Sequence, residues 1–108
     1  MMDDVQDNGM LEHVVATVIR VANPTRIVLF GSLARGDAGP DSDMDLLVVV
    51  PPGRHRRETA RQVYRALARC GRAVDVVVVT TEDIELYRHD PGMVIAAALA
   101  EGRDLYAA

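Results

Sequence analysis

Two aspartates spaced two residues apart stand at the start of an apolar run, and a third lies thirty residues further along the chain. Asp43 and Asp45 lead into the run 46–50, and Asp75 interrupts the valine-rich run 73–79. On a strand, Asp43 and Asp45 would point to the same side, where two carboxylates repel each other unless a cation holds them. A buried, unpaired Asp75 would also be costly, because its charge would lose its hydration. If the two strands are neighbours, the three carboxylates converge on Mg²⁺, a hard cation that prefers oxygen ligands.

Gly31 and Ser32 lie ten residues before Asp43 and suit the binding of a phosphate. Gly31 ends the apolar run 27–30, and a glycine lets a phosphate approach the backbone closely. The Ser32 hydroxyl can donate to that anion, as can the free N–H groups at the start of a helix. Arg35, one turn onward, can reach the same anion with two hydrogen bonds. The two groups of residues together indicate a site for a triphosphate with a divalent metal.

The same residues are compatible with plainer roles. Asp43 and Asp45 could be turn residues of a solvated loop, and Asp75 could lie in water on an edge strand. A calcium-binding EF-hand loop is excluded because Leu46 and Pro52 stand where that loop needs Gly and Glu. The glycine spacing of a Walker phosphate loop is present, but the Lys and the Ser or Thr that must follow it are not. The joint spacing therefore favours the metal and phosphate site.

Helical and strand patterns place these residues in a small α/β (α+β) protein. Apolar residues at helical spacing predict helices over 9–23, 55–71, 82–89 and 91–101. Continuous apolar runs predict strands over 27–30, 46–50 and 73–79, with a possible short edge strand over 104–106. The segment 31–42 is predicted to be a loop with one helical turn. Because the crossover 51–72 is long, the second and third strands should be parallel in a mixed sheet flanked by helices.

Length and composition limit the class of protein. The chain has 108 residues, a formal charge of -4, 49% hydrophobic residues and 26% charged residues, which predicts one globular domain over 1–108. Cys70 is the single cysteine, so neither an intrachain disulfide nor a four-cysteine zinc site is expected. No targeting or membrane-spanning pattern stands out, which favours a cytoplasmic protein without membrane association. A catalytic chain this short is expected to use a partner for its acceptor surface.

Arginine is concentrated in the segment 54–72, which holds seven arginines and one acidic residue, Glu58. Four of them recur at four-residue spacing: Arg57, Arg61, Arg65 and Arg69. A solvated helix face is the simplest interpretation, followed by a docking surface for an acidic partner. RNA contact ranks third because no aromatic side chains interleave to stack bases. Tyr64 lies on the apolar face of this helix and is predicted to be a core residue, and the three histidines show no ligand spacing.

The residues 31–37, Gly-Ser-Leu-Ala-Arg-Gly-Asp, followed by Pro-Asp-Ser-Asp-Met-Asp-Leu-Leu-Val over 40–48, resemble the signature of a known family. The pattern is similar to that of the minimal nucleotidyltransferases of the DNA polymerase beta superfamily. The resemblance extends from the first predicted helix to Tyr106, and Leu33 is a minor departure because a longer or basic residue is frequent there. It implies a polymerase-beta-like nucleotidyltransferase fold. The small size is similar to that of the group paired with a HEPN-domain partner, often as antitoxin and toxin.

The resemblance also implies roles for the candidate residues. Asp43 and Asp45 would bind two catalytic Mg²⁺ ions, Asp75 would complete the metal site and help activate the attacking hydroxyl, and Gly31 and Ser32 would hold the β- and γ-phosphates. The implied reaction transfers a nucleoside monophosphate, expected to be AMP from ATP, to a hydroxyl with release of pyrophosphate. In the HEPN-paired group the expected acceptor is a tyrosine of the partner toxin, which makes the reaction a protein AMPylation. The alternatives are an antitoxin that neutralises by binding alone and an accessory module that contacts nucleic acid.

Overall fold

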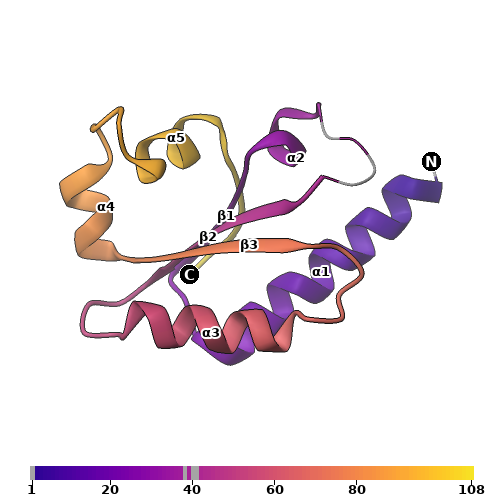
Figure 1. Ribbon diagram of the computed structural model, residues 1–108, viewed down its shortest axis with the longest axis horizontal. Helices are drawn as coiled ribbons and strands as arrows, with labels where there is room; N and C mark the ends of the chain where they lie inside the picture. Colours follow the sequence, from indigo (N-terminus) through magenta and orange to yellow (C-terminus); the bar gives the residue numbers. More distant parts are fainter. Residues whose placement is uncertain (1, 38, 40–41) are drawn as a thin grey trace.

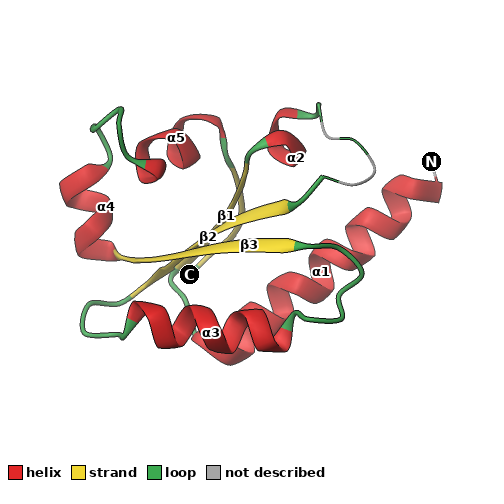
Figure 2. Ribbon diagram, in the orientation of Figure 1, coloured by secondary structure: helices red, strands yellow, loops and turns green. Residues whose placement is uncertain are grey.

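The computed structural model describes residues 2–37, 39 and 42–108, with side chains from residue 9 onward. Its elements follow the chain in this order: α1 (Met2–Ala22), β1 (Arg26–Phe30), α2 (Ser32–Arg35), β2 (Met44–Val50), α3 (Arg56–Ala66), β3 (Val74–Thr80), α4 (Thr81–Tyr87), α5 (Val94–Glu101) and β4 (Arg103–Ala107). Figures 1 and 2 show the helices around a twisted central sheet. The alternation of strands and helices confirms the predicted mixed α+β class.

The described strands form one mixed sheet in the order β3-β2-β1-β4. β1 pairs with β2 and with β4 in antiparallel fashion, whereas β2 and β3 are parallel, as the long crossover through α3 predicts. The short edge strand expected over 104–106 is present as β4. The order leaves β3 at one edge of the sheet, with β2 on one side only.

Each face of the sheet carries its own apolar core. On one face, Met44, Leu46 and Val48 of β2 pack with Val14 and other residues of α1 and α3. On the other face, Leu47 and Val49 pack with residues of α4 and α5, among them Ile84 and Ile95. Figure 1 shows α1 and α3 on the side of the sheet opposite α4 and α5. This alternation explains why a strand buried on both faces reads as an unbroken apolar run.

The boundaries of several elements differ from the predicted ones for local reasons. β2 begins at Met44, two residues earlier than predicted, because the Met44 N–H donates to the Ala73 carbonyl at 2.9 Å and extends the pairing. α5 begins at Val94 and not at residue 91, because the Asp90 carboxylate accepts from the Gly92 N–H at 3.0 Å and holds that turn outside the helix. Residues 38, 40 and 41 of the predicted loop lie outside the described residues. Within the described part of the chain, no helix has the length and hydropathy needed to cross a membrane.

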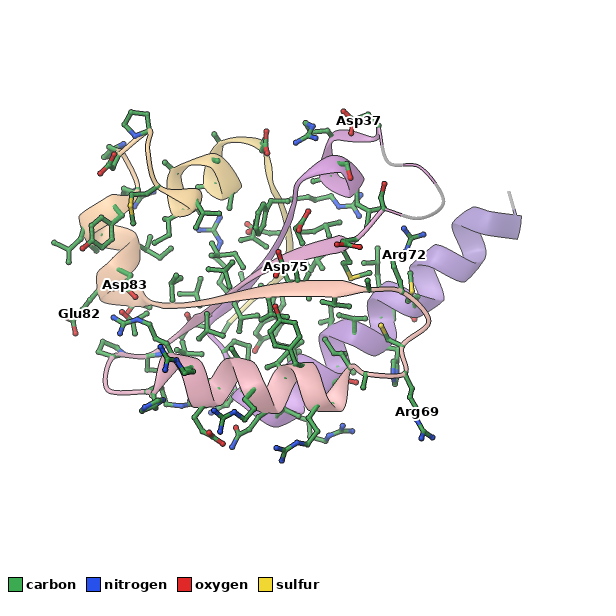
Figure 3. The ribbon with its side chains drawn as sticks, viewed as in Figure 1. Asp37, Arg69, Arg72, Asp75, Glu82 and Asp83 are labelled. Carbon is green, nitrogen blue, oxygen red and sulfur yellow. The ribbon has the colours of Figure 1, made fainter. Side chains whose placement is uncertain are left out.

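The start of α4 is fixed by a helix cap at Thr80. The Thr80 hydroxyl accepts from the Asp83 N–H at 3.1 Å, and the Asp83 carboxylate accepts from the Thr80 N–H at 2.9 Å. Arg56 at the start of α3 adds two hydrogen bonds to the same carboxylate, at 2.7 and 2.9 Å. Asp83, labelled in Figure 3, therefore ties α3 to α4 at the end of β3.

We expect Asp83→Ala to lower the free energy of unfolding by about 1–2 kcal/mol at pH 7, because it removes the carboxylate that accepts from the Thr80 N–H and pairs with Arg56. Hydrogen bonds from Arg56, and then from the Thr80 backbone, hold the pKa of Asp83 below its usual range. The stabilisation is therefore present above the unfolded pKa of about 3.9 and is lost as the pH falls through the lower folded pKa. Urea unfolding at pH 7 and pH 3 measures both effects.

Glu85→Ala is the matched control on the same helix. Glu85 is exposed, and its contact is a long i,i+3 ion pair of 3.8 Å with Arg88. Its expected cost is below about 0.5 kcal/mol. Equal losses for the Asp83 and Glu85 variants would show that the cap contributes nothing specific.

Candidate functional site

The candidate carboxylates lie at the start of the two parallel strands. Asp45 of β2 and Asp75 of β3 are direct register partners, and Asp43 immediately precedes β2. Asp45 alternates with Leu47, which packs against α4 and α5, so its side chain belongs to that face of the sheet. Asp75 stands in the equivalent position two residues before Val77. The structure therefore brings Asp45 and Asp75 together on one face, as the parallel pairing predicts.

Among the three candidate aspartates, Asp45 has the least favourable surroundings for a negative charge. It is half-buried, and no described residue donates a hydrogen bond to its carboxylate. Burial raises the pKa of Asp45, and the negative charges of Asp75 and Asp43 raise this pKa further, whereas Arg35 lowers it. A carboxylate in these surroundings is stabilised by a cation.

Gly31 touches Asp45 directly. Its backbone has φ 76° and ψ -155°, a region that residues with side chains rarely adopt, and it precedes the first residue of α2, Ser32. A Cβ atom at this position would collide with Oδ2 of Asp45. The sequence analysis predicts that Gly31 lets a phosphate approach the backbone. In the structure, a glycine at this position also leaves room for the Asp45 carboxylate. Ser32 is half-buried beside it, and the roles of Gly31 and Ser32 toward phosphate stay predictions.

Arg35, at the last position of α2, is held between two acidic residues. Its Nε atom lies 3.3 Å from Asp37, and its Nη1 atom lies 3.2 Å from Glu101 at the end of α5. All three side chains are exposed. Arg35 affects the pKa of Asp45, so its charge lies close to the carboxylates. The sequence analysis did not identify Glu101 as a residue near the site, because its contact with Arg35 joins residues 66 positions apart.

Tyr64 of α3 is not the core residue that its position on an apolar helix face predicts. Its side chain is 42% exposed, and its hydroxyl lies 2.9 Å from Oδ1 of Asp75. The same hydroxyl accepts from the Val76 N–H at 2.8 Å. The reason is that β3 is an edge strand, so a long side chain with a polar end can reach around its open side. Burial raises the pKa of Tyr64 above its usual value.

The edge position of β3 also corrects the expectation for Asp75. Asp75 is exposed, so it bears no cost of an unpaired buried charge, and the solvated alternative describes it better. Repulsion between carboxylates applies instead to its half-buried neighbour Asp45. Two of the three aspartates, Asp43 and Asp75, are therefore reachable from solvent.

The donor set fits Mg²⁺ as an open site. In the described residues, no three His, Cys, Asp or Glu side chains are gathered closely enough to enclose a metal. Mg²⁺ commonly binds through one or two carboxylates and completes its octahedron with water and substrate phosphates. Asp45, desolvated and repelled by Asp43 and Asp75, is a suitable first ligand for such a site.

The arginine segment has structural roles in part. Arg54 donates to the Ala22 carbonyl at the end of α1, Arg56 pairs with Asp83, and Arg72 donates to the Ser42 carbonyl at 2.8 Å. The predicted stripe is shorter than expected because α3 ends at Ala66, so Arg69 lies beyond the helix, as Figure 3 shows. Arg54, Arg56 and Arg72 thus contact three different parts of the described chain.

A family model described as a nucleotidyltransferase domain matches residues 15–103, which include every candidate site residue. A crystal structure of a toxin–antitoxin with AMP-PNP has a TM-score of 0.58 and 24% identity, over 90% of this chain and 73% of that chain. Comparison with curated protein sequences gives no match.

Two structures of mutants of the toxin–antitoxin MntA-HpeT are also similar. One carries glutamates in place of two aspartates that are two residues apart, with a TM-score of 0.57 and 22% identity over 90% of this chain and 73% of that chain. The other carries alanine in place of a tyrosine, with a TM-score of 0.56 and 22% identity over 90% of this chain and 72% of that chain. At these identities the likeness is one of fold.

Proposed function

Because the chain belongs to the nucleotidyltransferase domain family, we propose that it transfers AMP from ATP to a hydroxyl group and releases pyrophosphate. The observation that carries this proposal is the half-buried carboxylate of Asp45, which lies against Gly31 and is repelled by Asp43 and Asp75. Such a group has no structural use for its charge and is suited to a metal–nucleotide complex. The similar fold of a toxin–antitoxin solved with AMP-PNP is consistent with ATP as the nucleotide.

In the proposed reaction, Asp43 and Asp45 would hold Mg²⁺ together with the triphosphate, and Asp75 would complete the metal site. When bound, Mg²⁺ neutralises charge on the phosphates and on the attacking and leaving oxygens. Gly31 and Ser32 contact the β- and γ-phosphates, and Arg35 exchanges an acidic partner for a phosphate oxygen. Asp75 is exposed and accepts the proton of the attacking hydroxyl. A bond forms between that oxygen and the α-phosphorus while the bond from the α-phosphorus to the bridging oxygen breaks, so pyrophosphate leaves.

We propose that the acceptor is a tyrosine of a HEPN-type partner toxin, so that the chain acts as its antitoxin by AMPylation. The motif resemblance and the fold shared with toxin–antitoxin structures support this assignment. The exposed positions of Asp43 and Asp75 leave room for a partner side chain to reach the carboxylates.

The test is transfer of label from α-labelled ATP, with Mg²⁺, to the protein encoded by the adjacent gene. We expect wild type to label one tyrosine of that protein, located by mass spectrometry, and Asp43→Asn to reduce the rate by at least about 100-fold. Asp104→Asn is the matched control, because Asp104 is an exposed aspartate on β4 that pairs with Arg26 at 2.8 Å.

Two results would count against this function. Equally low labelling by wild type and Asp43→Asn with all four nucleoside triphosphates would remove the enzymatic proposal. Neutralisation of the partner that persists in the double variant Asp43→Asn, Asp45→Asn would show that binding alone is sufficient.

A further inference from the structure

The hydroxyl of Tyr64 joins the two sides of the sheet at the open edge of β3. Helix α3 belongs to the face opposite the carboxylates, yet its Tyr64 side chain reaches Oδ1 of Asp75 at 2.9 Å. No described strand pairs with the outer side of β3, so the Val76 N–H on that side donates to the Tyr64 hydroxyl at 2.8 Å. The hydroxyl thus replaces a missing strand partner and contacts a candidate catalytic carboxylate at once.

These two contacts determine where the single proton of the hydroxyl points. Because the Val76 N–H donates to the Tyr64 oxygen, the oxygen acts there as an acceptor, and its own proton is available to one other group. The Asp75 oxygen at 2.9 Å is better placed to receive it than the Val76 carbonyl at 3.4 Å. A hydrogen bond to a carboxylate is also the stronger kind. Tyr64 therefore donates to Oδ1 of Asp75, and Oδ2 has no hydrogen-bond partner among the described residues.

Asp75 needs such a restraint because it is exposed and lies beside a like charge. Its register partner Asp45 repels it, and no described basic residue pairs with it. A free aspartate side chain in this position would turn toward water and away from Asp45. A donor fixed at one oxygen limits the side chain to fewer rotamers and reduces the entropy lost when the other oxygen binds a ligand.

We propose that Tyr64 is a positioning residue that holds Asp75 through Oδ1 and leaves Oδ2 for the divalent metal and the attacking hydroxyl. The inference rests on the proposed function and extends it to a residue on the far side of the sheet. It also gives a reason for a half-exposed tyrosine on an otherwise apolar helix face.

The experiment compares Tyr64→Phe with wild type in Mn²⁺ binding, measured by the electron paramagnetic resonance of free Mn²⁺, and in transfer kinetics. Loss of the hydroxyl is expected to weaken Mn²⁺ binding about 10-fold, as is typical when a residue that orients a metal ligand is removed. The transfer rate kcat should fall by a similar factor of about 10, with little change in the KM for the acceptor. Tyr87→Phe is the matched control, because Tyr87 is a partly exposed tyrosine on α4.

A double-mutant cycle separates positioning from simple sealing of the strand edge. In an Asp75→Asn background, Tyr64→Phe should change Mn²⁺ affinity by less than about 2-fold, because the carboxylate it positions is gone. Mn²⁺ affinity unchanged in Tyr64→Phe, or reduced equally in both backgrounds, would overturn the proposal. A wild-type chain that binds no Mn²⁺ at millimolar concentration would overturn it as well. Loss of Mn²⁺ binding in Tyr64→Phe without transfer by wild type would overturn the proposed function and support the positioning role.

Discussion

Replacing Asp45 with asparagine is expected to stabilise the metal-free protein while nucleotide transfer falls by at least about 100-fold. The half-buried carboxylate has no described hydrogen-bond donor, and Asp75 and Asp43 repel it. Asparagine has nearly the same shape without the charge, so the repulsion and the desolvation cost both disappear. A rise in melting temperature of about 3 °C in EDTA is the expected order of magnitude for a domain of this size.

The same pKa shift predicts how this stabilisation depends on pH. Burial first, and then the neighbouring carboxylates, raise the pKa of Asp45 in the folded state, so folding favours its protonated form. The corresponding stability is complete below the unfolded pKa of about 3.9 and is lost as the pH rises through the higher folded pKa. The advantage of Asp45→Asn over wild type should therefore grow from pH 4 toward pH 7 and then level off. Melting curves in EDTA across this range measure it.

Adding Mg²⁺ with a non-hydrolysable ATP analogue should reverse the order of stability. A ligand that binds only the folded state stabilises it by mass action, and only wild type keeps the proposed ligand set. Asp104→Asn, on the far edge strand, should respond like wild type. If Asp45→Asn instead melts below wild type in EDTA at pH 7, the carboxylate stabilises the metal-free fold, and its charge is not one that a metal is needed to offset.

The paired strands of the site could be predicted from the sequence because each strand and the helical crossover between them show a clear pattern in their own residues. Apolar runs of strand length on either side of a helical crossover favour parallel pairing, and in the observed register Asp45 is the partner of Asp75. The helix cap at Thr80 is visible in the sequence for the same reason, since its partner Asp83 is three residues away. Each of these features depends on residues whose relative positions the backbone geometry determines.

The environment of the site could not be predicted, because it depends on the order of the strands. Nothing local indicates that β3 is an edge strand, and this position exposes Asp75 and lets Tyr64 reach it. Helical periodicity predicts Tyr64 as a core residue and says nothing about the contact of its hydroxyl with Asp75. The contact of Arg35 with Glu101 likewise requires the packing of α5 beside α2.

Gly31→Ala is expected to abolish most of the Mn²⁺ binding and nucleotide transfer while it lowers the stability of the fold only moderately. The backbone of Gly31, at φ 76° and ψ -155°, disfavours any side chain and should cost about 1–3 kcal/mol in the free energy of unfolding. The new Cβ would also collide with Oδ2 of Asp45. Because that oxygen is the far end of a side chain, Asp45 can turn away at little energetic cost. The collision should therefore appear mainly as a loss of Mn²⁺ binding and of transfer, each by at least about 100-fold.

Gly53→Ala separates backbone strain from the collision. Gly53 has a similar φ of 91°, in the turn between β2 and α3, and a Cβ there meets no atom within 4 Å. Both variants should lose comparable stability in urea unfolding, whereas only Gly31→Ala should lose Mn²⁺ binding. Near-normal Mn²⁺ binding and transfer by Gly31→Ala would mean that Asp45 functions from more than one position. The close contact of Gly31 with Asp45 would then be a matter of chain geometry alone, and the metal site would have to be assigned to Asp43 and Asp75.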